Sequence, residues 1–77
     1  MYKEGQIVRV VVCKGSNPII SNTMVEYLKV CAMDRVEVEI PDNKDFIMEI
    51  KDGQIEEIQD GGQTILLVVM TAKIVKI

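Results

Sequence analysis

The sequence predicts an α+β domain that is mainly β: a strongly curled antiparallel sheet or a small barrel of about five strands, with one short helix after the first strand. Isoleucine and valine, with 11 residues each, far outnumber the 3 leucines and 2 alanines, and β-branched side chains favour strands. Helix-forming residues gather in only one segment, residues 24–33. Because a chain of 77 residues suits one core, residues 1–77 are expected to form a single domain.

The first third of the chain predicts a strand, a loop and a helix. Residues 6–13 are mostly apolar and predict the first strand. Residues 14–23 are rich in glycine, serine, asparagine and proline, which predicts a loop. Thr23 and Glu26 match a capping box, in which each side chain satisfies a free backbone N–H of the other residue. The helix is therefore expected over residues 24–33.

The strongest hairpin signal is Asp52-Gly53, a dipeptide that suits a two-residue type I′ turn. We therefore expect antiparallel strands at residues 46–51 and 54–59. This turn would place Glu49 opposite Glu56, an unfavourable pair of like charges. A bulge at Glu56 and Glu57 would relieve that repulsion and bring the nearby isoleucines to one face.

The other strands flank this hairpin. Residues 36–40 alternate apolar and charged side chains, which predicts a strand with one buried face. Residues 41–45 and 60–63 are rich in turn formers. Residues 64–77 predict a long strand that is apolar on both faces in its first half, so both faces need cover. Because one short helix covers only one face, we expect the sheet to close into a barrel or to pair with a second copy of the chain.

The negative charge is concentrated in the middle of the chain. Residues 34–60 contain ten acidic and three basic side chains, whereas both ends carry a net positive charge. Such an acidic block keeps a small apolar protein soluble or meets a basic partner through complementary potentials. The chain has no histidine, which excludes histidine-based acid–base catalysis and zinc sites of the Cys/His type.

Cysteine usage and the N-terminus favour a cytoplasmic protein. Cys13 and Cys31 lack a metal-type spacing and sit among apolar residues, so we expect two buried free thiols. Charged residues such as Lys3 and Arg9 interrupt any apolar stretch at the N-terminus, so no signal peptide is expected. The longest apolar run, residues 65–70, is too short to span a bilayer. We expect no cofactor, no metal and no membrane contact.

The candidate partner site is an acidic sheet face within residues 34–60. Carboxylates at alternate positions of neighbouring strands share one face, and such a surface would attract a protein partner that is basic. The predicted partner-binding residues are Glu37, Glu39, Glu49, Asp52, Glu56, Glu57 and Asp60.

A weaker candidate site is the loop before the helix, since the N–H groups of a helix N-terminus bind anions. Residues suited to a phosphate or carboxylate there are Lys14, Ser16, Asn22 and Thr23. Their spacing matches neither the P-loop nor the dinucleotide fingerprint, and ordinary capping and turn chemistry explains the same residues. Residues 42–45 offer oxygen ligands but lack the pattern of a calcium-binding EF-hand loop.

These features predict a non-catalytic protein-binding or regulatory module that forms a homo-oligomer and presents the acidic face to a protein partner. No enzyme activity is expected, because a nucleophilic cysteine would lack its usual activating base. The alternative is a small-barrel nucleic-acid-binding protein that uses the positive ends of the chain. Its basic residues would be Arg9, Lys14, Lys29, Lys73 and Lys76. Three aromatic residues and an acidic centre make nucleic acid the less favoured partner.

Overall fold

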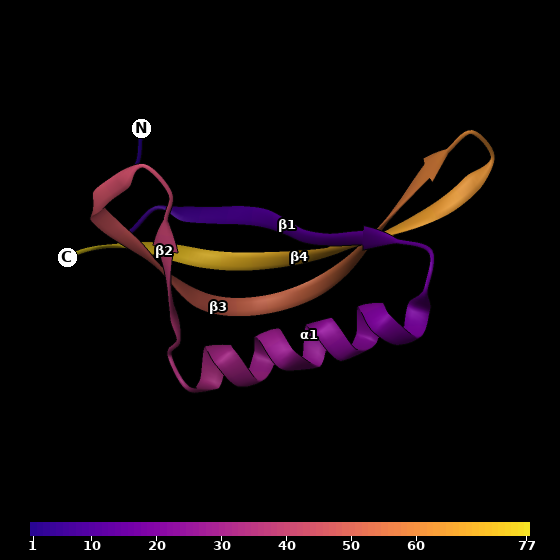
Figure 1. Cartoon of the computed structure of the whole chain (residues 1–77), viewed down its shortest axis with the longest axis horizontal. Coiled ribbons are helices and arrows are strands. Elements are labelled where there is room, and N and C mark those ends of the chain that lie inside the picture. The colour runs from indigo at the N-terminus through magenta and orange to yellow at the C-terminus, as the bar shows by residue number, and fades with distance from the viewer.

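The computed structural model describes residues 1–77 and contains four strands and one helix. In chain order the elements are β1 (Ile7–Gly15), α1 (Pro18–Met33), β2 (Glu37–Ile40), β3 (Asn43–Asp60) and β4 (Gln63–Lys76). The strands form one antiparallel sheet in the order β1-β4-β3-β2. α1 follows β1 and packs mainly on β3, as Figure 1 shows. The predicted α+β class, mainly β with one helix after the first strand, is confirmed.

The prediction of a barrel or a strongly curled sheet of about five strands is wrong. The sheet has four strands and is open, because β1 and β2 are edge strands that pair with β4 and β3 but not with each other. β3 and β4 are far longer than their partners, and their shared hairpin projects beyond the end of β1 (Figure 1). The missing fifth strand arises because the two segments around Asp52-Gly53 are one continuous strand.

The predicted hairpin turn at Asp52-Gly53 is therefore also wrong. β3 runs through both residues, and the chain reverses instead at Gly61-Gly62, within the predicted turn at residues 60–63. Gly61 and Gly62 have φ angles of 57° and 80°, as both central residues of a type I′ turn require. Two glycines adopt this backbone without strain, so they form the turn while Asp52-Gly53 stays extended.

The bulge in β3 falls at Lys51 rather than at Glu56 and Glu57, where we predicted it. The β3 residues on either side of Lys51 pair with consecutive residues of β4, so Lys51 is the extra residue. Because Lys51 is one extra residue, odd-numbered residues after it lie on the same face as even-numbered residues before it. Ile55 therefore lies on the helix side of the sheet with Ile50, and Ile58 lies on the opposite face.

α1 begins at Pro18, well before the predicted start at residue 24. Asn17 is the N-cap, and its Oδ1 accepts hydrogen bonds from the backbone N–H groups of Ile19 at 3.0 Å and Ile20 at 3.3 Å. Proline suits the first helical position, where its missing N–H would have no partner in any case. The predicted Thr23 cap is wrong, because the Thr23 hydroxyl lies inside the helix and donates to the Ile19 carbonyl.

The core is a single layer between α1 and one face of the sheet. Its buried residues are Leu28, Cys31, Ile40, Met48, Ile50, Val68, Met70, Ala72 and Ile74. The even-numbered residues of β4 from Val68 to Ile74 supply four of them, because alternate side chains of a strand share a face. Cys31 is buried and Cys13 half-buried, and both are free thiols. No helix in the structure combines the length and the apolar character that crossing a bilayer requires.

Candidate functional site

The helix-free face, meaning the face of the sheet opposite α1, carries most of the predicted site residues. Side chains on this face form rows that cross the strands, because the register brings one residue of each strand side by side. Three successive rows, read from β1 through β4 to β3, are Arg9–Thr71–Asp52, Val11–Val69–Gln54 and Lys14–Leu67–Glu56. Charged side chains therefore occupy both sides of a central strand that is mainly apolar on this face.

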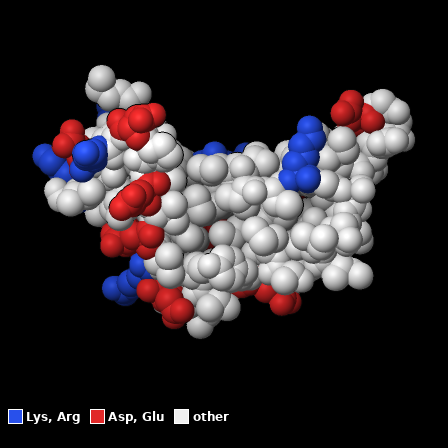
Figure 2. Space-filling view, in the orientation of Figure 1, with Lys and Arg blue, Asp and Glu red and all other residues white.

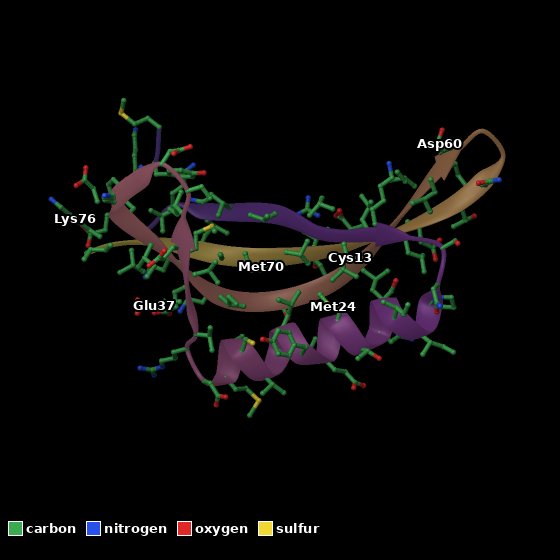
Figure 3. The ribbon with its side chains drawn as sticks, viewed as in Figure 1. Cys13, Met24, Glu37, Asp60, Met70 and Lys76 are labelled. Atoms are coloured by element: carbon green, nitrogen blue, oxygen red, sulfur yellow. The ribbon has the colours of Figure 1, made fainter.

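Five of the seven predicted acidic residues alternate with core residues and so lie on the helix-free face. They are Glu37, Glu39, Glu49, Asp52 and Glu56. Glu57 lies on the helix side, paired with Leu66, and Asp60 pairs with Gln63 beside the hairpin turn. Figure 3 shows Glu37 and Asp60 near opposite ends of the molecule. The structure therefore brings five of these carboxylates to one face and separates the other two from them.

The same face also carries basic residues, so it is not uniformly acidic. Arg9 and Lys14 project from β1, and Lys73 of β4 pairs with Glu49 in the register. No acidic residue occurs in β1, whereas β2 and β3 supply all the carboxylates of the face. The helix-free face is therefore polarised, with positive charge along β1 and mainly negative charge on β3 and β2.

An ion pair between Arg9 and Glu56 joins β1 to β3 across the intervening strand β4. In the register, Arg9 lies beside Thr71 and Glu56 beside Leu67, so the pair passes over Val69 between them. Val69 is only 2% exposed although it points away from the helix. The ion pair therefore covers the centre of a face that no other element of the chain covers.

Glu49 has the most perturbed carboxyl group of the face. A hydrogen bond from the Lys51 ammonium is the largest cause that lowers the pKa of Glu49, and the nearby charges of Arg35 and Lys73 lower it further. Lys51 lies two residues after Glu49 in β3, and the alternation of a strand places both side chains on the same side. Glu49 thus stays ionised despite its cross-strand neighbour Glu37.

The five basic residues of the nucleic-acid alternative do not share a face. Arg9, Lys14 and Lys73 lie on the helix-free face, Lys76 pairs with Phe46 on the helix side, and Lys29 belongs to α1. The structure therefore divides these residues among the helix and both faces of the sheet.

The four residues of the predicted anion site are also divided. Lys14 lies near the end of β1, Ser16 in the connecting loop, and Asn22 and Thr23 inside α1. The helix N-terminus itself is capped by Asn17, as described above.

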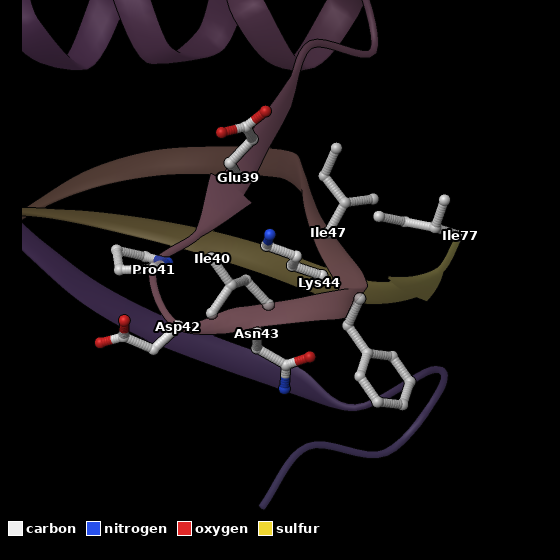
Figure 4. A pocket seen from close by; sticks show the side chains of 9 residues that line it. Glu39, Ile40, Pro41, Asp42, Asn43, Lys44, Ile47 and Ile77 are labelled. Carbon is white, nitrogen blue, oxygen red and sulfur yellow. The ribbon is translucent and has the colours of Figure 1, made fainter.

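The largest cavity lies beside the turn between β2 and β3 and has a volume of about 800 Å³. Its walls include Glu39, Pro41, Lys44, Phe46 and the C-terminal Ile77. In Figure 4, the side chains of Asp42 and Asn43 extend from the turn away from Glu39. Their side-chain oxygen atoms therefore do not converge with the Glu39 carboxylate on one point. The structure contains no group of three or more Cys, Asp or Glu side chains placed to hold a metal ion.

A second hollow, of about 450 Å³, forms an apolar groove on the helix side of the sheet. Val10 and Val12 of β1, Met24 and Tyr27 of α1 and Val38 of β2 are among its lining residues. α1 covers β3 and part of β4 but leaves β1 without helix cover. Figure 3 shows Met24 pointing from α1 toward the sheet, and Figure 2 shows no charged side chain in the middle of this face.

This groove was not predicted, because its walls come from the helix and all four strands, which only the packing of α1 brings together. The sequence did predict that the second face of β4 needs cover, because β4 is apolar on both sides between Ile65 and Met70. The Arg9–Glu56 ion pair was not predicted, and 47 positions along the chain separate its two residues.

Comparisons of the chain with protein-family models, with curated proteins and with solved structures returned no match in any of the three.

Proposed function

We propose that this chain is a non-catalytic protein-binding or regulatory module that contacts its partner through the helix-free face of the sheet. The observation that carries the proposal is the combination of bare apolar side chains and ordered charges on that face. Ile7 and Val11 are 58% and 55% exposed, and they flank Arg9 on the same edge strand. Exposed apolar side chains rimmed by charged ones are typical of protein interaction sites.

The charge pattern of the face favours a protein partner over a nucleic acid. Phosphate backbones require a contiguous basic surface and are repelled by carboxylates. Here the carboxylates of β2 and β3 share the face with the basic residues, and Arg9 is already neutralised by Glu56. The unpaired carboxylates Glu37 and Glu39, by contrast, suit basic side chains on a protein.

Site-specific photo-cross-linking tests this proposal. A photoreactive amino acid replaces Val11 on the helix-free face or, as the control, Ile19 on α1, which is 75% exposed. We expect protein adducts from position 11 and not from position 19 when each variant is irradiated in a lysate of the source cells. Adducts only from position 19, or from neither position, would overturn the assignment of the face.

Charge reversal at the same surface sharpens the test. Glu37→Lys and Glu39→Lys remove two carboxylates that form no ion pair within the chain. With a separate basic protein as the partner, we expect this double variant to lose most of the adduct from position 11, because like charges would then meet across the contact. Glu26→Lys, on the helix, is the matched control and should leave that adduct unchanged.

A further inference from the structure

We infer that the partner of the helix-free face is a second copy of this chain, packed face to face about a twofold axis parallel to β4. The inference rests on the proposed function, because it names the partner of the same face. It follows from the charges in two of the rows described above, which are complementary to one another about such an axis.

Two rows carry a basic residue on β1 and an acidic residue on β3. They are Arg9–Thr71–Asp52 and Lys14–Leu67–Glu56, with β4 midway between the two charges in each. A twofold axis along β4 places β1 of one copy over β3 of the other. Arg9 then faces Asp52 of the second copy, and Lys14 faces Glu56. Both contacts join opposite charges, and symmetry repeats each of them.

The alternative twofold axis, perpendicular to the strands, gives the opposite result. It would place β1 over β1 and β3 over β3, so Arg9 would face Lys14 and Asp52 would face Glu56. Both contacts would join like charges, which are repulsive at an interface. The charges of these two rows thus favour one of the two twofold arrangements that keep the strands of both copies aligned.

Apolar residues lie between the charged rows, where a sheet-on-sheet contact needs them. Val11, which is 55% exposed, lies in the middle row, and the half-buried Leu67 lies on β4 in the next row. Two sheets packed with nearly aligned strands bury such residues between them at a separation of about 10 Å. The Arg9–Glu56 pair within each chain then belongs to a larger network, since Asp52 and Lys14 of the second copy extend it.

The first measurement is the native mass as a function of protein and salt concentration. We expect twice the 8.7 kDa mass of one chain at low salt. Because the contact depends on ion pairs, the dissociation constant of the dimer should rise several-fold between about 50 mM and 500 mM salt. A monomer at every protein concentration would overturn the inference.

The decisive measurement uses two complementary charge-reversal variants. The first carries Arg9→Glu and Lys14→Glu, and the second carries Asp52→Lys and Glu56→Lys. Each variant alone should be a monomer, because β1 and β3 of its two copies then carry like charges. An equimolar mixture should form a heterodimer, in which every reversed charge meets its opposite. Both variants lose the Arg9–Glu56 pair within the chain, so its loss does not explain a recovery on mixing.

The outcomes separate this inference from the proposed function. If the dimer persists in both variants alone, the two copies meet through another surface and the inference is wrong. If the chain is monomeric but position 11 still cross-links to a different protein, the proposed function stands and only the second copy is excluded. If position 11 forms no adduct of any kind, the proposed function fails as well.

Discussion

A β-carbon built on Gly53 of β3 would lie 2.6 Å from the Cβ atom of Leu28 in α1. Leu28 therefore rests directly on the backbone of the sheet, where any other residue would place a side chain. Leu28 belongs to the buried core and is only 4% exposed. A glycine inside a strand often marks such a close approach, and here it determines how near the helix packs to β3.

Gly53→Ala is expected to lower the free energy of unfolding by about 1–3 kcal/mol, the usual cost of overpacking a core. The clash involves Leu28 Cβ, which cannot move without displacing α1. Urea denaturation measures the change. Gly15→Ala is the control, because a β-carbon at Gly15 meets nothing within 4 Å. Equal losses in the two variants would contradict the packing role of Gly53.

The hairpin turn predicts a graded response at Gly61. Its φ of 57° lies in the left-handed region, which costs most residues other than glycine about 1–2 kcal/mol and asparagine less. Gly61→Val should therefore destabilise the protein by roughly that amount, whereas Gly61→Asn should be almost neutral, since Asn-Gly is a favoured type I′ pair. Thermal unfolding of the two variants checks this order, and a valine variant as stable as the asparagine variant would be inconsistent with the turn.

The helix start predicts a contrast between Asn17 and Thr23. Asn17→Ala removes the side chain that accepts from two backbone N–H groups and should cost about 1 kcal/mol. Thr23→Ala removes only a hydroxyl bonded to a carbonyl within the helix, so a change below about 0.5 kcal/mol is expected. Chemical denaturation of both variants measures the two losses of stability. A larger loss for Thr23→Ala than for Asn17→Ala would instead support a helix that begins at residue 24.

Glu49 predicts a pH-dependent contribution to stability. Folding lowers the pKa of this carboxyl below its ordinary value of 4.5. The contact with Lys51 therefore stabilises the fold above that value, and the contribution is lost as the pH falls through the lowered pKa. Lys51→Met should raise the pKa of Glu49, as followed by an NMR titration of its carboxyl carbon. Lys44→Met is the control, and an unchanged titration in Lys51→Met would exclude Lys51 as the cause.

The order of most elements could be predicted because local patterns determine them. Alternation identified the strand that ends at Ile40, and a run that is apolar on both faces identified the strand that begins at Gln63. The glycine pair marked the true hairpin turn. The errors occurred where a local signal competed with packing. Asp52-Gly53 has the chemistry of a turn, but Gly53 lies buried beneath Leu28 within a continuous strand.

The candidate site could be predicted only in part, for a similar reason. The alternation of carboxylates along β2 correctly placed Glu37 and Glu39 on one face. Charge counts along the chain suggested a separate acidic block and basic ends. The sheet order places β1 and β3 on either side of β4, so acids and bases from distant segments share the face.

Residue types and their local spacing are sufficient to predict a β-rich domain with one helix, and a strand β4 that is apolar on both faces. These properties depend on residue type and on the spacing of neighbouring residues. Secondary-structure propensities and the alternation of apolar side chains therefore predict them. Long-range packing determines that the sheet stays open and that the helix covers β3 rather than β1. Long-range packing also brings Arg9 to Glu56 across β4. Those features arise from contacts between residues far apart in the chain. The energies of such contacts cannot be inferred from the pattern of neighbouring residues.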